Sequence, residues 1–276
     1  MKSLFVLLIA VGASLSSDPG LARKSDLRAD RIQFSYVPPK NPEHETVFRL
    51  LKERQVLEKF KQFLSPLRLP RTLRLKLAGC DGDSNAWYED DTVTMCYEYI
   101  DEQLKNAPKE TTPAGVTRVD AIVGPTIEVF LHEVGHAVFD YLKVPLFGRE
   151  EDAADQFAAY LLLEFGKSDA RRLMGGVAYA FHEKASVPST KKNPFADEHG
   201  LPAQRFYNML CTAYGADPKL FADLVEKQYL PAERAEGCDG EYAQITRAMK
   251  TLIWPYIDRA RAKQVRAKQW LKFDPE

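Results

Sequence analysis

Two histidines and one glutamate within five residues are the part of this sequence best suited to chemistry. Residues 132–136 read His-Glu-Val-Gly-His, inside an apolar stretch that is typical of a buried helix. On a helix, His132 and His136 lie on the same face one turn apart, so both imidazoles can bind one metal ion, and zinc prefers such ligands. Glu133 can then reach a water on that ion without ligating it, which is the position of a general base. The alternative is a pair of ordinary histidines on a core helix.

A third ligand is expected from the next helix, because catalytic zinc has three protein ligands and one open position. After a short connection, four acids open that helix: Glu150, Glu151, Asp152 and Asp155. Glu151 and Asp155 share a face, beside small alanines that let the two helices pack closely. We therefore expect Glu151 to ligate the metal and Asp155 to bond a ligating histidine. The alternative is that these acids only favour the positive N-terminus of the helix.

These two motifs resemble those of a known group. A His-Glu-x-x-His motif followed by Glu-x-x-x-Asp on the next helix resembles the gluzincin metallopeptidases. The extended pattern, HEVGHAVFDY and GREEDAADQFAAY, is more similar still to an uncharacterised bacterial family of secreted proteins described as putative metallopeptidases. The similarity spans most of 75–245 and includes these further segments: Cys80, residues 85–88 (NAWY), residues 96–98 (CYE), residues 204–208 (QRFYN), Leu230-Pro231 and Cys238.

The resemblance implies a function and further site residues. It implies that one zinc ion per chain serves the hydrolysis of peptide or protein substrates. Gluzincins place a helical active-site lobe beside a sheet whose edge strand pairs with an extended peptide, and residues 71–99 can supply that edge here. They also use a side chain that stabilises the oxyanion of the transition state. We expect the loop residue His199 in this role. The other candidates are His182, Arg205 and Tyr207.

The elements that must position these residues are mostly helices. A helical pattern spans about 119–142 around the histidine motif. A half-buried strand is predicted at 71–78 and shorter strands at 87–88 and 93–99, which form a small antiparallel sheet before the motif helix. Further helices are expected at 43–64, 150–165, 168–185, 203–214, 218–228 and 240–270, with a long loop at 186–202. The predicted fold class is α+β, with one mostly helical, zincin-like domain over 43–276.

The N-terminus and the cysteines indicate export. Residues 1–17 have a positive start, a short apolar run and small residues, as in a secretory signal peptide cleaved between about residues 13 and 22. Residues 18–42 are polar and extended, with a possible strand at 32–37. Four cysteines in an oxidising compartment indicate two disulfides, for which three pairings are possible. The pairing of neighbours in the sequence is the simplest: Cys80 with Cys96 and Cys211 with Cys238. We expect a secreted or periplasmic protein.

The composition excludes some classes of function. The chain has 276 residues, of which 45% are hydrophobic, and a formal net charge of −1. This balance argues against a nucleic-acid partner, which needs a basic face, and no segment after the signal peptide is apolar enough to span a membrane. The main rival to a peptidase is a zinc-containing binding or scaffold protein without turnover. A metal-free structural protein is the third hypothesis. The sequence makes no prediction of the oligomeric state or of the peptide that is cleaved.

Overall fold

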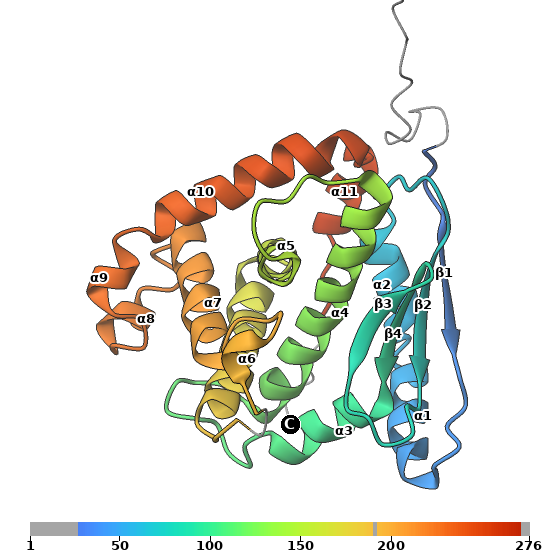
Figure 1. The fold of residues 1–276 in the computed structure, drawn as a ribbon, viewed down its shortest axis with the longest axis horizontal. Helices are drawn as coiled ribbons and strands as arrows, with labels where there is room; N and C mark the ends of the chain where they lie inside the picture. The colour runs from blue at the N-terminus through green and yellow to red at the C-terminus, as the bar shows by residue number, and fades with distance from the viewer. Residues whose placement is uncertain (1–26, 190–191, 272–276) are drawn as a thin grey trace, which may run out of the picture.

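The computed structural model describes residues 27–189 and 192–271, and the predicted signal peptide lies outside these ranges. Most of the described chain is helical, and a small sheet precedes the long helices (Figure 1). The strands are β1 (Ile32–Tyr36), β2 (Leu73–Ala78), β3 (Ala86–Glu89) and β4 (Thr92–Cys96). The α-helices are α1 (Glu45–Glu53), α2 (Val56–Leu64), α3 (Tyr97–Asn106), α4 (Arg118–Leu142), α5 (Glu150–Leu163), α6 (Lys167–Ala185), α7 (Pro202–Ala216), α8 (Asp223–Glu226), α9 (Ala232–Ala235), α10 (Cys238–Ala248) and α11 (Arg259–Arg266). The predicted α+β class is confirmed.

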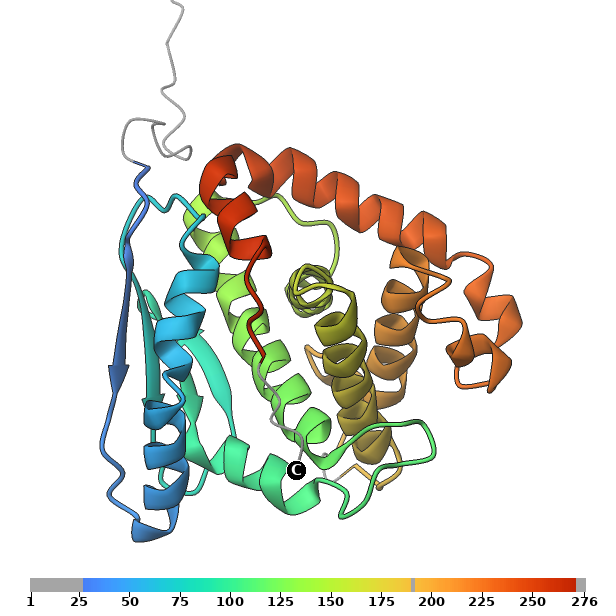
Figure 2. The same ribbon diagram turned by 180° about the vertical axis from the view of Figure 1, so that it is seen from behind.

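The sheet is mixed, so the prediction of an antiparallel sheet was wrong. Its strand order is β1-β2-β4-β3, in which β2 pairs in parallel with both β1 and β4, and β3 pairs antiparallel with β4. Helices α1 and α2 connect β1 to β2 and cover one face of the sheet (Figure 2). This helical connection returns the chain to the starting end of the sheet, so β2 can run parallel to β1. In contrast, β3 and β4 are joined by Asp90 and Asp91 alone, whose φ angles of 47° and 61° suit a tight hairpin turn.

Some predicted elements begin or end elsewhere. A strand was predicted as far as residue 99, but α3 already begins at Tyr97. The helical pattern at 43–64 is interrupted at Gln55, whose φ is 51°. The pattern at 240–270 is interrupted near Pro255, which lacks the N–H that a continuous helix needs. Of residues 218–228, only the single turn of α8 is α-helical.

Helix α4 lies in the middle of the molecule and carries the histidine motif. It begins with a reciprocal cap, in which Thr117 and Asp120 each accept a hydrogen bond from the backbone N–H of the other. The sheet lies on one side of α4, and α5 and α6 lie on the other (Figure 1). The contact with α6 is very close, since a Cβ added at Gly176 would lie 1.9 Å from the carbonyl oxygen of Asp120. Only glycine fits there, so the position of α6 against α4 is fixed by this residue.

Both disulfides of the predicted pairing are present. Cys80–Cys96 ties the loop after β2 to the end of β4, and Cys211–Cys238 ties α7 to α10. Within the described residues, no helix combines the length and the apolar character that crossing a membrane requires.

Candidate metal centre

The histidine motif and the acids meet where α5 packs against the middle of α4. Gly135 lies inside the motif at this contact, and a Cβ added there would lie 3.2 Å from the Phe157 ring and 3.4 Å from Ala154 Cα. Small residues on both helices therefore permit the close approach that the sequence predicted. As a result, the first turn of α5 brings Glu150 and Glu151 to the two histidines of α4.

Three potential ligand atoms converge at this contact. Nε2 of His132 lies 2.9 Å from Oε2 of Glu151 and 3.1 Å from Nε2 of His136. Nε2 of His136 lies 3.4 Å from the same oxygen of Glu151. In a tetrahedral zinc site the ligand atoms lie about 3.3 Å from one another, given bonds of about 2.0–2.1 Å. The three edges of this triangle are close to that length, so the group of His132, His136 and Glu151, called the metal centre below, fits a zinc ion.

Carboxylates determine where both imidazoles carry their protons. Nδ1 of His132 lies 2.8 Å from Oδ1 of Asp155. Nδ1 of His136 lies 2.8 Å from Oε1 of Glu150. Since a carboxylate accepts hydrogen bonds, each Nδ1 carries a proton, which leaves Nε2 of each ring as the nitrogen that can bind a metal beside Glu151. In the metal-free protein a proton joins Nε2 of His132 to Oε2 of Glu151, and a cation bound between the same atoms would replace it. The chemistry of this donor set therefore suits a divalent metal.

Arg205 holds Asp155 from the side opposite the histidine. Its Nε lies 2.7 Å from Oδ2 of Asp155, and its Nη2 lies 2.6 Å from Oδ1. Its Nη2 also lies 3.9 Å from Oε1 of Glu128, a buried oxygen that has no hydrogen-bond partner among the described residues. Glu128, His132 and Asp155 are close enough to bind a second cation. However, the guanidinium group already provides a positive charge to both carboxylates, so this second group does not need a metal.

Burial and carboxylates shift the pKa values around the metal centre. Burial lowers the pKa of His132, but hydrogen bonds to Asp155 and Glu151 outweigh burial and raise this pKa to about 10. Burial also opposes ionisation of Glu151, yet bonds from His132 and His136 hold its pKa well below the usual range. Burial raises the pKa of Glu128 to about 7, with a further contribution from the charge of Asp155. A metal that binds here therefore displaces protons from the histidines.

The surroundings of Glu133 indicate a different role from that of the candidate ligands. Its side chain is buried, and within the described ranges it has no hydrogen-bond partner. Burial raises the pKa of Glu133, while the nearby His132 and His136 act in the opposite direction. A carboxylate that no described residue engages, next to the candidate metal ligands, remains able to accept a proton from a reactant.

His199 lies at the exposed edge of the metal centre. Its Nε2 is 2.8 Å from Oε2 of Glu151, and its ring stacks against His132 with 5.8 Å between the centroids. It does not belong to the group of ligand atoms that lie within 4.8 Å of one another. Asp197 lies 3.3 Å from its other ring nitrogen, and 43% of the side chain is exposed. His199 is thus beside the third ligand and open to a substrate.

The other three candidates for the oxyanion role differ from His199 in their contacts. Arg205 is engaged by Asp155, as described above. His182 is exposed on α6 and contacts the ring of Phe206. Tyr207 lines a pocket of about 580 Å³ together with Gly200.

The sequence did not identify three contributors to the site: Glu128, Glu150 in its contact with His136, and Arg205 in its contact with Asp155. Glu128 could have been found, because it lies one helical turn before His132 on the same face.

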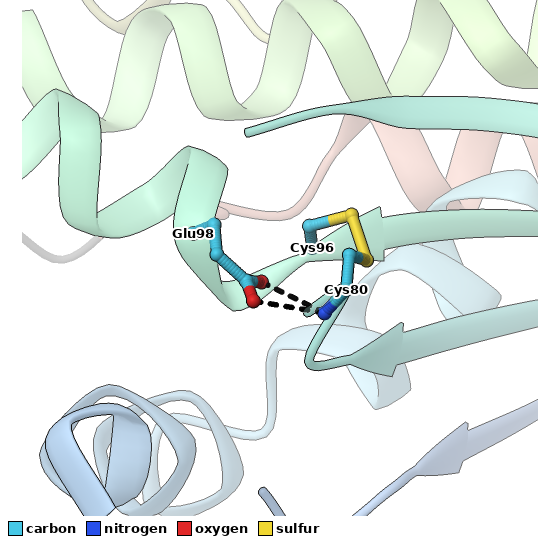
Figure 3. A group of neighbouring side chains, drawn as sticks. All are labelled: Cys80, Cys96 and Glu98. Atoms are coloured by element: carbon cyan, nitrogen blue, oxygen red, sulfur yellow. Dashed lines mark hydrogen bonds between the residues drawn. A yellow bond between two sulfur atoms is a disulfide. The ribbon is translucent and has the colours of Figure 1, made fainter. Parts of the chain in front are cut away.

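One further group of potential ligands does not form a metal site. Cys80, Cys96 and Glu98 lie close together, but the two sulfur atoms are bonded to each other and are not available to a metal (Figure 3). The carboxylate of Glu98 instead accepts hydrogen bonds from the backbone N–H groups of Cys80 and Gly82. This group stabilises the loop after β2.

Comparison with known proteins gives one match. A model of the DUF4344 family, described as "Putative metallopeptidase", matches residues 36–253. No curated protein and no solved structure matches the chain. The matched residues cover β2 to β4 and α1 to α10, and so include all the residues of the metal centre together with Asp155 and Arg205.

Proposed function

Since the chain belongs to this family of putative metallopeptidases, we propose that it is a zinc-dependent peptidase whose metal is held by His132, His136 and Glu151. The observation that carries this proposal is the convergence of the two Nε2 atoms and Oε2 of Glu151, with both Nδ1 atoms engaged by carboxylates. A zinc ion held by these residues would act as a Lewis acid, which would activate water and polarise the scissile carbonyl. One such ion per chain is sufficient for this chemistry.

The side chains around the metal centre have separate roles in the proposed hydrolysis. Glu133 takes a proton from the attacking water and delivers it to the leaving amine, for which its unengaged carboxylate is suited. His199 donates a hydrogen bond to the oxyanion that forms from the scissile carbonyl, since its ring lies at the exposed edge of the metal centre. Asp155 keeps the proton on Nδ1 of His132, so that Nε2 stays directed at the metal.

The sheet edge supports a peptide as the substrate. β3 is an edge strand and lies beside α4 (Figure 1). The N–H of Cys96 bonds to the carbonyl of Asn85, so this pair is a hydrogen-bonded pair of the ladder. Because such pairs alternate along an antiparallel ladder, Ala86 and Tyr88 direct their N–H and C=O groups away from β4. The N–H of Ala86 already donates to Oδ1 of Asn85 at 2.9 Å, so an extended peptide can add to the sheet through the remaining free groups, which are the C=O of Ala86 and both groups of Tyr88.

The proposed location is outside the cytoplasm, as a secreted or periplasmic enzyme. Two disulfides support this location, because such bonds persist in oxidising compartments. The signal-like residues 1–17 are a second, independent support.

A library of quenched fluorescent peptides tests the proposed activity. Each peptide is incubated with zinc-loaded protein, with protein stripped by a chelator, and with stripped protein to which zinc is returned. We expect cleavage by the first and third preparations and none by the second. Protein that holds one zinc per chain and cleaves nothing in a broad library would instead favour the zinc-containing scaffold without turnover.

A further inference from the structure

An ion-pair network joins the edge of the sheet to the motif helix. Arg71, which precedes β2, donates from Nε to Oδ1 of Asp91 at 2.5 Å and from Nη2 to Oδ2 of Asp140. The hydroxyl of Tyr88 donates to the same oxygen of Asp140 at 2.7 Å. The guanidinium group also lies over the ring of Tyr141, 4.0 Å from the centroid. The network therefore contacts the β3–β4 turn, the edge strand and the last turns of α4 at once.

Asp140 has a particular position on α4. It follows His136 by four residues, as His136 follows His132, so the three side chains occupy successive turns of one helix face. The network thus holds β3 at the same face of α4 that carries two of the metal ligands. Because Tyr88 belongs to β3 itself, its bond to Asp140 sets how far the free groups of the edge strand lie from the metal centre.

Resting on the proposed function, we propose that Arg71 is a positioning residue for peptide binding. By holding Asp91 and Asp140 together, it fixes the edge strand relative to the metal. A peptide that pairs with Tyr88 and with the C=O of Ala86 then places its scissile bond at the metal centre. Among the described residues the ion pairs of Arg71 are with Asp91 and Asp140, so it acts on β3 through Asp140 and the β3–β4 turn. The Arg71 side chain is 41% exposed and Asp140 36%, so we expect a moderate effect.

Two ligands of different length test this inference without requiring turnover. Acetohydroxamic acid reaches only the metal, whereas a mixture of N-acetyl tripeptide hydroxamates with varied side chains also extends along the sheet edge. The dissociation constant of acetohydroxamic acid and the apparent dissociation constant of the tripeptide mixture are each measured with zinc-loaded protein. We expect Arg71→Met to weaken binding of the tripeptide hydroxamates by about three- to tenfold, and to leave the zinc content and the binding of acetohydroxamic acid unchanged. Arg71→Lys should restore part of the loss, because lysine is a point charge that cannot bond both carboxylates in the same way.

Lys143 provides a matched control. Its Nζ pairs with the other oxygen of Asp140 at 2.9 Å, and in the part of the chain that the structure describes no ion pair joins it to a strand. Lys143→Met should therefore change neither dissociation constant. If Arg71→Met does not fold, Tyr88→Phe is used in its place, since it removes only the hydroxyl that bonds Asp140. It should likewise weaken binding of the tripeptide hydroxamates and leave binding of acetohydroxamic acid unchanged.

The outcomes separate this inference from the proposed function. A wild-type protein that binds neither zinc nor acetohydroxamic acid overturns both. Equal weakening of the two ligands by Arg71→Met, or no weakening of either, overturns the positioning role alone. So does a wild-type protein that binds the tripeptide hydroxamates no better than acetohydroxamic acid, because the edge strand then contributes nothing.

Discussion

Nδ1 of His132 lies 2.8 Å from Oδ1 of Asp155, and this contact determines which nitrogen of the ring faces the metal centre. The histidine is on α4 and the aspartate on α5, so the bond also fixes the two helices relative to each other at the site. Arg205 engages both oxygens of the same carboxylate, which leaves Asp155 little freedom to rotate. The orientation of a metal ligand thus depends on a side chain that comes 73 residues later in the chain.

Asp155→Asn should weaken zinc binding by about 10- to 100-fold, because a neutral amide holds the imidazole proton less firmly. The change is measured as the zinc dissociation constant in competition with a chelator. Asp152→Asn is the control, since Asp152 is on the same helix but pairs with Arg149.

Arg205→Met should also weaken zinc binding. In the double variant with Asp155→Asn it should add little to the loss, because both changes disrupt the same support. Additive losses would show that Arg205 acts by another route.

Glu133→Gln should keep one zinc per chain and lose turnover by at least about 100-fold, as expected for removal of a general base. The glutamine has nearly the same size and cannot take up a proton. Zinc content is measured beside the rate of peptide cleavage. Activity near the wild-type level in a variant that still binds zinc would exclude Glu133 as the base.

Glu128→Gln should change how the stability of the metal-free protein depends on pH. Burial raises the pKa of Glu128 from 4.5 to about 7. Between these values the folded state binds a proton that the unfolded chain has already lost. The contribution of the protonated group is therefore fully present below about pH 4.5 and is lost as the pH rises through about 7. We expect the free energy of unfolding of the variant, relative to the wild type, to improve from pH 5 to pH 8. A difference that is constant over this range would contradict the assignment.

Gly176→Ala should destabilise the fold without directly altering the metal centre. The added Cβ would lie 1.9 Å from the carbonyl oxygen of Asp120, so the backbones of α4 and α6 must separate. We expect a loss of about 1–3 kcal/mol or more in the free energy of unfolding, measured by denaturant titration. Gly240→Ala on α10 is the control, because a Cβ there meets no described atom within 4 Å. Equal stabilities of the two variants would mean that α4 and α6 are not so closely packed.

Local patterns in the sequence predicted most of the site residues on α4 and α5, but not Glu128 or the contact of Glu150 with His136. Helical spacing places His132, His136 and Glu133, and the small residues beside Glu151 and Asp155 indicate the close helix contact. The contact with Arg205 could not be predicted in this way. It lies on α7, 50 residues after Asp155, and helical spacing within one element says nothing about which elements pack together.

The same limit explains the differences in the fold. Alternation of apolar residues predicts that 71–78 is a strand, but it carries no information about the direction of its neighbours. The parallel pairing with β1 depends on how α1 and α2 cross the sheet, which is a long-range property. Similarly, the interruption of the predicted helix at Gln55 is not marked by a glycine or a proline, whereas the interruption of the later helix is marked by Pro255.

Elemental analysis of the purified protein beside a His132→Ala variant tests the central claim most directly. The wild type should hold one zinc ion per chain, and the variant should hold little or none, because it lacks the ligand that bonds both Glu151 and Asp155. Circular dichroism of both proteins ensures that the variant is folded. Wild-type protein without metal even after incubation with zinc, or equal zinc in both proteins, would contradict the assignment of the metal centre.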